Sequence, residues 1–187
     1  MRNSLIYFFI LFLIISSCDS EKINISGTIT GYADSTRIIL NNLDNEKGVD
    51  TTFIIDNQFT FTVFKSEPTP HGLFIGQEYD FLFFWLEDEN VTIKGTKDKL
   101  KYALTKGGEV EKQDNEFQEY TRLLTLRLDS VKQESRKAFG QNDLQNAQIL
   151  QKQMEKLIHE RIELGAKYIR ENPDNLLSAF ALEGYIL

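Results

Sequence analysis

The sequence predicts a mainly β domain followed by α-helices. The β part should form an antiparallel β-sandwich or curled sheet of about seven or eight strands, and the rest an α-helical hairpin with a short terminal helix. Two observations lead to this order. From residue 23 to residue 95 apolar and polar residues alternate, which is the period of a β-strand. After Gly107 and Gly108 the apolar residues recur every three or four positions, as on one face of an α-helix.

The first 17 residues are predicted to be a signal peptide. An apolar run of about eleven residues covers positions 5–15, whereas a membrane-spanning helix needs about 20 residues. Ile15, Ser16 and Ser17 lead directly into Cys18. This order resembles a bacterial lipobox, in which the cysteine receives a diacylglyceryl group and the signal is cut before it. The resemblance makes Cys18 the lipidation site, and makes Ile15, Ser16 and Ser17 the signal-recognition residues.

Acylation of Cys18 predicts a protein that is held on a membrane by its N-terminus, with residues 18–22 as a short acylated tether. Each buried methylene contributes about 0.8 kcal/mol, so two or three lipid chains give a lasting anchor. We therefore expect a lipid-anchored protein of the cell envelope, in the outer membrane. The periplasmic face and the cell-surface face of that membrane are both alternatives for its location. The alternative is an incidental cysteine at the end of an ordinary signal peptide.

Seven segments show the alternation, or the β-branched and aromatic content, of strands. In the first segment Ile23, Ile25 and Ile29 share one face. The sixth is apolar on both faces, so this strand should be buried on both sides. A buried helix is the alternative for such a run, but its short length and its aromatic residues favour a strand. The segments are 23–31, 37–43, 49–55, 59–64, 72–75, 79–86 and 91–94.

Turn residues and prolines predict how these strands are interrupted. Asp56 and Asn57 tolerate the left-handed backbone of a tight turn, so we expect a hairpin between segments 49–55 and 59–64. Pro68 and Pro70 are expected to break the strand ladder, because proline has no N–H to donate.

Two long helices and a short one are predicted after Gly108. The first covers residues 111–139 and is expected to end at Gly140 as a left-handed cap. The second helix is expected to be capped by Asn142 or Asp143 and to run to about residue 171. The turn between the two helices has only three or four residues, which predicts an antiparallel hairpin. A third helix covers residues 176–186. The chain thus divides into a β domain at 23–107 and a helical part at 108–187. The predicted inner stripe of the first helix contains Phe117, Tyr120, Thr121, Leu124, Leu128, Val131 and Ala138. That of the second contains Ala147, Leu150, Met154, Leu157, Leu164 and Tyr168, with Arg161 at an inner position.

Composition excludes several kinds of function. The net charge is −7, and no stripe of lysine and arginine occurs, so nucleic acid is excluded as a partner. Cys18 is the single cysteine. If it is acylated, no thiol is left for a disulfide, for thiolate catalysis or for a cysteine metal site. We therefore expect no cofactor and no metal.

Three short motifs resemble a known family. They read Ile-Ser-Gly-Thr-Ile-Thr-Gly at 25–31, Asp-Asn-Gln-Phe-Thr-Phe at 56–61, and Trp-Leu followed by Asn-Val-Thr-Ile-Lys-Gly within 85–95. In order and spacing they resemble a domain of unknown function from Bacteroidota lipoproteins, which commonly precedes a TlpA/ResA-like thiol-disulfide oxidoreductase of thioredoxin fold. The resemblance covers roughly residues 23–107. The chain departs from the family at Gln58, where the family has Gly-Lys, and it contains no Cys-x-x-Cys, so we expect the thioredoxin domain to be absent.

The other possible catalytic residues form incomplete motifs. His159 begins a His-Glu-Arg-Ile-Glu run, but a metalloprotease helix would have its second histidine at Glu163. His71 has no second histidine near it in the sequence. The aromatic residues within 81–85 are expected to belong to the core rather than to a ligand pocket. A charged first turn and an exposed helix face are predicted for Glu109, Glu111, Asp114, Glu116 and Glu119.

These observations predict a membrane-anchored lipoprotein that is not an enzyme as the chain stands and that acts as a binding or scaffolding module. The alternative is the N-terminal part of a TlpA/AhpC-like thiol-disulfide oxidoreductase whose catalytic thioredoxin domain is missing or separately encoded. The expected partners are the membrane, through the lipid anchor, and a thioredoxin-like or other protein of the cell envelope.

Overall fold

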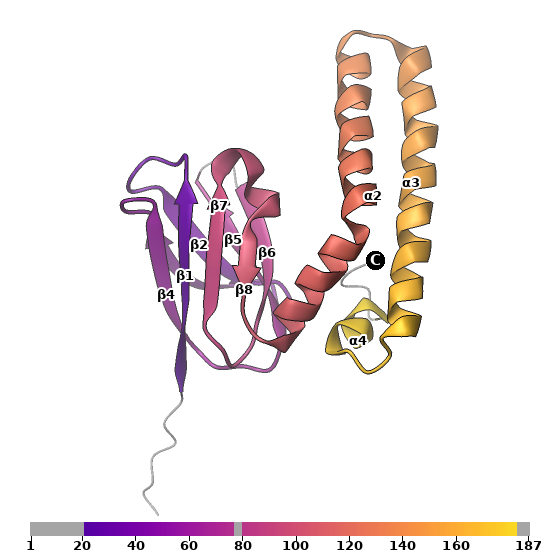
Figure 1. Cartoon of the computed structure of the whole chain (residues 1–187). Helices are drawn as coiled ribbons and strands as arrows, with labels where there is room; N and C mark the ends of the chain where they lie inside the picture. Colours follow the sequence, from indigo (N-terminus) through magenta and orange to yellow (C-terminus); the bar gives the residue numbers. More distant parts are fainter. Residues whose placement is uncertain (1–20, 77–79, 183–187) are drawn as a thin grey trace, which may run out of the picture.

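The computed structural model of the chain describes residues 21–76 and 80–182 (Figure 1). In these two ranges, eight strands form two four-stranded sheets, and a long helical hairpin and a short helix follow them. The predicted fold class, a β part followed by α-helices, is confirmed. The predicted signal peptide lies outside the described residues, and so do Ile15, Ser16, Ser17 and Cys18.

The first sheet has the strand order β4-β1-β7-β8. Its strands pair antiparallel, except that β1 and β7 run parallel, with Ile25 opposite Val91. The short strand β8 forms the edge of the sheet next to the helices. The bounds are Lys22–Thr30 for β1, Gln58–Phe64 for β4, Val91–Thr96 for β7 and Leu104–Lys106 for β8.

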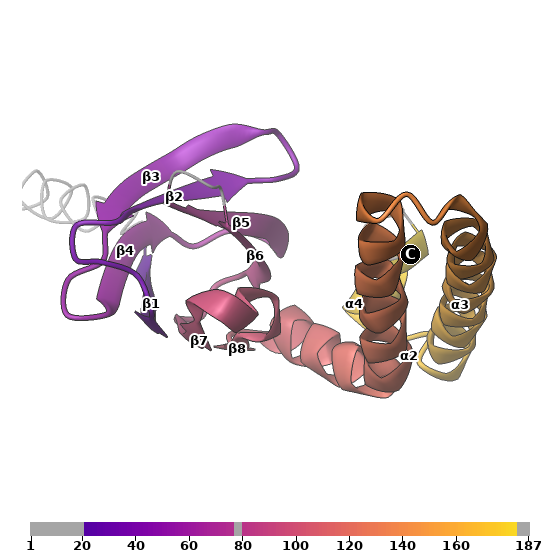
Figure 2. The same ribbon diagram turned by 90° about the horizontal axis from the view of Figure 1, so that it is seen from above.

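The second sheet has the order β3-β2-β5-β6 and is antiparallel throughout. Its edge strand β6 lies on the same side of the molecule as β8, so both sheets present an edge to the helices (Figures 1 and 2). The bounds are Arg37–Asn42 for β2, Lys47–Phe53 for β3, Thr69–Ile75 for β5 and Asp80–Leu86 for β6.

The core of the β part lies between the two sheets. The predicted inner face of the first strand is confirmed, because Ile23, Ile25 and Ile29 are all buried. Phe61 from the first sheet and Phe84 from the second belong to the same apolar cluster. Burial of this apolar surface, at about 25 cal/mol per Å², is the main force that holds the sheets together.

The predicted hairpin turn is confirmed, but its two strands belong to different sheets. Asp56 and Asn57 have φ angles of 50° and 62°, which is the left-handed backbone that the turn requires. The flanking segments pair only at Ile55 and Gln58, because β3 then pairs with β2 and β4 pairs with β1. The turn is therefore the corner at which the chain crosses from one sheet to the other.

The expectation that Pro70 breaks the ladder is wrong, because Pro70 lies inside β5 and pairs with Trp85 of β6. Its carbonyl accepts the Leu43 N–H at 2.9 Å, just beyond the end of β2 at Asn42. In an antiparallel pair, the nitrogen of a strand residue points to the same side as its carbonyl. The nitrogen of Pro70 therefore points beyond the end of β2, where no N–H is needed for pairing between β2 and β5.

Two elements between the sheets and the helices were not predicted. A 3-10 helix, η1, covers Lys97–Tyr102, and β8 follows it. Leu100 of η1 is buried in the core of the sandwich. Both elements are too short to show a period in the sequence, so β7 was expected to be the last strand.

The helices are α2 at Glu109–Gly140, α3 at Leu144–Glu171 and α4 at Leu176–Leu182. The Asp143 side chain accepts the Asn146 N–H at 3.2 Å, which confirms the predicted cap of the second long helix. Gly140 is not the left-handed residue that was expected. It is the last residue of α2, and Asn142 has the positive φ, 58°. Asparagine tolerates this conformation because its short polar side chain can hydrogen-bond locally.

α2 and α3 form the predicted antiparallel hairpin, which projects beyond the sandwich (Figure 1). Its core contains Leu128, Val131, Ala138, Ala147, Leu150 and Leu157, which all belong to the predicted stripes. α2 bends in its first half (Figures 1 and 2). There the Thr121 hydroxyl donates to the Phe117 carbonyl at 3.0 Å, a bond that is typical of bent helices. In residues 21–76 and 80–182 no helix has the length and apolar character that crossing a membrane requires.

α4 joins the sandwich to the hairpin. Its Leu177 is buried with Trp85 of β6, Val110 and Phe117 of α2, and Tyr168 of α3. Phe180 stacks on Trp85 with 4.5 Å between the ring centroids. The Leu177 N–H donates to the Gln113 side chain of α2 at 3.1 Å. Leu177 and Phe180 of α4 thus pack against β6 and both long helices.

Candidate functional site

α2 is joined to both sheets by the carboxylate of Glu111. One oxygen accepts the backbone N–H of Trp85, on the outer edge of β6, at 2.7 Å. The other accepts the hydroxyl of Thr105 in β8. The Asn115 side chain adds a third link, because its amide donates to the Thr105 carbonyl at 3.0 Å. Polar groups of α2 therefore take the place of a further strand beside each sheet.

A second buried carboxylate caps the start of α2. Glu87 follows β6, and its Oε1 accepts the N–H of Val110 at 2.8 Å and of Glu111 at 3.3 Å. The N-cap residue itself, Gly108, has no side chain with which to cap the helix. A Cβ at Gly108 would lie 2.6 Å from the Glu87 carboxyl group. Glycine is therefore needed here so that Glu87 can reach the free N–H groups of the first turn.

Burial changes the ionisation of these acids. It raises the pKa of Glu111 to about 7, although the bonds from Thr105 and Trp85 favour the charged form. Burial likewise raises the pKa of Asp114, one turn further along α2, to about 6. The pKa of Glu87 is raised for the same reason and is held down in part by the N–H groups of α2.

A second set of polar contacts joins the sandwich to α2 about five turns beyond Glu111. Asp129 of α2 accepts hydrogen bonds from Lys101 and from the Tyr102 hydroxyl, both in η1. Partial burial raises the pKa of Asp129, but these two bonds lower it below its ordinary value. The contacts of Glu111 with Trp85 and Thr105 form one clasp between α2 and the sandwich, and those of Asp129 with η1 form a second clasp.

A groove of about 590 Å³ lies between α2 and the sandwich, in the region between the two clasps. Large apolar side chains are exposed in it: Phe81 by 41 %, Tyr102 by 47 % and Leu104 by 52 %. Exposed apolar side chains gathered in a concave space mark an interaction site. The lining is Phe81, Leu82 and Phe83 from β6, residues 101–105 from η1 and β8, and Asp114, Asn115, Gln118, Glu119, Arg122 and Thr125 from α2.

The β part of the chain, with the first turn and a half of α2, is similar to one known family. Residues 23–114 match the family model of a domain of unknown function, DUF4369. No curated protein and no solved structure matches the chain. The expected resemblance to a domain of unknown function is thereby confirmed. The DUF4369 match includes Glu87, Glu111 and Asp114, so it reaches beyond the sheets to the clasp at Glu111.

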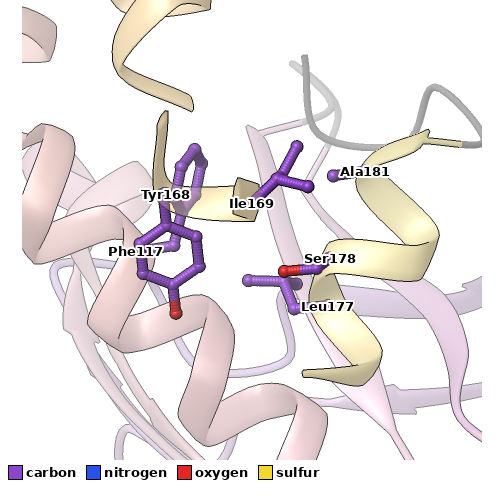
Figure 3. A pocket seen from close by; sticks show the side chains of 6 residues that line it. All are labelled: Phe117, Tyr168, Ile169, Leu177, Ser178 and Ala181. Carbon is purple, nitrogen blue, oxygen red and sulfur yellow. The ribbon is translucent and has the colours of Figure 1, made fainter. Parts of the chain in front are cut away.

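A second, much smaller cavity lies outside the DUF4369 match, between the three helices. Its volume is about 10 Å³, which is at the lower limit for one water molecule. Figure 3 shows the six side chains that surround it: Phe117, Tyr168, Ile169, Leu177, Ser178 and Ala181. This cavity is a gap in the packing under α4 and is too small for a ligand.

The two histidines are not brought together. His71 is buried in β5, where its Nδ1 lies 3.0 Å from the Thr69 carbonyl oxygen and burial lowers its pKa. His159 lies on α3, with its Nε2 3.2 Å from Glu163 of the same helix. Within the described part of the chain, no three His, Cys, Asp or Glu side chains are grouped so that they could hold a metal ion.

The prediction for the acidic face of the first helix is wrong at two of its five positions. Glu109, Glu116 and Glu119 are exposed, whereas Glu111 and Asp114 are buried. Glu111 and Asp114 lie where α2 packs against the sandwich, and Glu119 lines the groove between α2 and the sandwich but stays exposed. The aromatic run in β6 also has a mixed role. Phe84 and Trp85 are buried as expected, but Phe81 and Phe83 line the groove.

Proposed function

We propose that this chain is a cell-envelope lipoprotein, anchored to the outer membrane through Cys18, that acts as a non-catalytic binding or scaffolding module. The groove between α2 and the sandwich is its binding surface. The observation that carries this proposal is the groove itself, in which exposed aromatic and aliphatic side chains gather between the two clasps. Concave sites of this kind, mostly apolar with a few placed polar groups, are the common form of binding sites.

The direction of the chain supports an anchor at the N-terminus. β1 begins at the end of the sandwich opposite to the direction in which the hairpin projects (Figure 1). Lys22, the first residue of β1, follows Cys18 by only four positions. A lipid at Cys18 would therefore hold that end of the sandwich at the membrane and direct the hairpin away from it.

The anchor is tested by Cys18→Ala in cells that are fed radiolabelled palmitate. Wild type should take up label and remain in the membrane fraction, whereas the variant should do neither. Equal labelling of the two proteins would overturn the lipoprotein proposal.

The binding surface is tested by a photo-crosslinking amino acid at one of two positions. Leu104 lines the groove, and Thr60 is exposed on β4, at the far edge of the same sheet. We expect an adduct with one defined protein from Leu104 and none from Thr60. That protein, once purified, should bind wild type and should fail to bind a chain in which Leu104→Arg obstructs the groove. Equal adducts from both positions would overturn the assignment of the groove.

The alternative proposal is that the chain is the N-terminal part of a thiol-disulfide oxidoreductase. The resemblance of residues 23–107 to a domain that precedes such enzymes supports it. It requires a reading frame for a thioredoxin-like domain with Cys-x-x-Cys next to this one, which the genomic DNA would show. Insulin reduction separates the two proposals for the chain as it stands. Turnover by the purified chain would contradict a non-catalytic role, because disulfide exchange needs a free thiolate.

A further inference from the structure

The groove has one charged lining residue that forms no ion pair within residues 21–76 and 80–182. Its four charged residues are Lys101, Asp114, Glu119 and Arg122. Lys101 pairs with Asp129, and the Arg122 Nε lies 3.0 Å from the Glu119 carboxylate. Among the residues that the structure describes, the Asp114 carboxylate accepts one hydrogen bond, a long one of 3.4 Å from the Gln118 amide. The Arg161 guanidinium of α3 acts on it electrostatically, at a distance beyond that of an ion pair.

Asp114 lines the groove and is only 7 % exposed. Phe81 and Phe83 of β6 line the same space. The counter-charge on Arg161 lies beyond ion-pair distance of Asp114, so the buried carboxylate is incompletely compensated, and a cation that reaches it gains a charge-assisted hydrogen bond. Aromatic rings beside the path of that cation favour it further, because they attract positive charge and cover an aliphatic stem.

We propose that the groove takes an extended peptide segment of a protein partner, with an arginine or lysine side chain whose charge meets Asp114 and whose methylene stem lies along Phe81 and Phe83. This inference rests on the groove being the binding surface. The α2 residues that line it span positions 114 to 125, which is about 17 Å of helix. That length accommodates about five residues of extended chain.

The charge of the molecule favours a basic partner over a second copy of the chain. The net charge is −7, so two copies repel each other, whereas a cationic segment is attracted to the surface. A second copy would also need to present a cation that is free to enter the groove.

The test is calorimetric titration of the full chain, in mild detergent, with two blocked pentapeptides. One is Ala-Ala-Arg-Ala-Ala, and the other has citrulline, which has nearly the shape of arginine but no charge, at the centre. We expect the arginine peptide to bind at least tenfold more tightly. Asp114→Asn should abolish that difference. Asp174→Asn is the matched control, because Asp174 is exposed outside the groove and the substitution removes the same charge.

A second variant keeps the proposal falsifiable if Asp114→Asn fails to fold, as judged by circular dichroism. Leu104→Arg changes an exposed lining residue and should abolish binding of both peptides. Unchanged binding to that variant would place the peptide elsewhere and overturn the inference. Equal binding of both peptides to wild type would overturn the charge preference, while specific adducts from Leu104 would still support the groove as the binding surface. Self-association that Leu104→Arg abolishes would make a second copy the occupant and would also overturn the inference.

Discussion

The Glu111 carboxylate does for β6 what a neighbouring strand would do. It accepts the N–H of Trp85 on the strand edge, and with its other oxygen it accepts the Thr105 hydroxyl. One side chain thus serves donors from both sheets. Removing it takes the acceptor away from a buried N–H, a loss that costs about 1–3 kcal/mol.

The raised pKa of Glu111 predicts how stability depends on pH. Its value is about 7 in the folded protein against an ordinary value of 4.5. Between these values the folded state binds more protons than the unfolded state, so the free energy of unfolding falls as the pH rises. Asp114, with a pKa of about 6, acts with the same sign. The side chain of the Glu111→Gln variant cannot ionise. The difference between its melting temperature and that of wild type should therefore shift in favour of the variant as the pH is raised from about 5 to about 8.

Differential scanning calorimetry at several pH values checks this prediction. Glu109→Gln is the matched control, because Glu109 lies two positions earlier on α2 and is exposed. Its melting temperature should follow that of wild type over the whole pH range. A constant difference between Glu111→Gln and wild type at every pH would contradict the prediction.

The sequence alone could not single out Glu111 and Asp114. Both lie in an acidic segment that looks like any solvated first turn of a helix, next to Glu109 and Glu116. The burial of Glu111 depends on contacts with Trp85 and Thr105, and the positive charge of Arg161 on α3 acts on Asp114, so both depend on other elements. The one local signal was the glycine at position 108, which leaves the start of the helix without a side-chain cap.

At the scale of elements, the periodicity of apolar residues predicted the long strands and helices, but it did not predict the short elements. The long strands and both long helices were predicted, because each carries several repeats of its apolar pattern. η1 and β8 were missed, because contacts with Leu100 and with β7 define them. The place of Pro70 inside β5 depends on where β2 ends, which the sequence of β5 does not contain.

The packing of α4 predicts unequal effects at two adjacent leucines. Leu177 is 2 % exposed, and Leu176 is 48 % exposed. Leu177→Ala should lower the free energy of unfolding by about 2–5 kcal/mol, because it leaves a cavity in the cluster around Trp85. Leu176→Ala should change it by less than about 0.5 kcal/mol. Urea unfolding of the two variants compares them directly, and equal effects would mean that α4 does not pack as described.

At the scale of the whole molecule, the sandwich and the hairpin have separate cores that meet in a third cluster. Of the described β residues, Trp85 and the partly buried Phe83 are the ones in that third cluster. In the same part of the chain, the core between the sheets contains no residue of the long helices. The sandwich should therefore retain its fold without the hairpin, at the cost of exposing Trp85.

Trp85 is the only tryptophan in the sequence and is fully buried, so its fluorescence reports on this junction. A chain that ends at Lys106 should keep a β-type circular dichroism spectrum. Its tryptophan emission should shift to longer wavelength, and acrylamide should quench it more strongly than in the full chain. Loss of the β spectrum would show that the hairpin is needed for the sandwich to fold.

The hairpin is held to the sandwich by two clasps that lie 18 residues apart on α2, at Glu111 and at Asp129, or about 27 Å along the helix. Its tip at Gly140 lies 11 residues beyond Asp129, or about 16 Å. If the clasp at Asp129 opened, the free length of α2 would extend back to Glu111, and a tilt of about 10° would move the tip by about 8 Å instead of about 3 Å. The groove lies between the clasps, so an occupant that separated η1 from Asp129 would give the far end of the hairpin a wider range of motion.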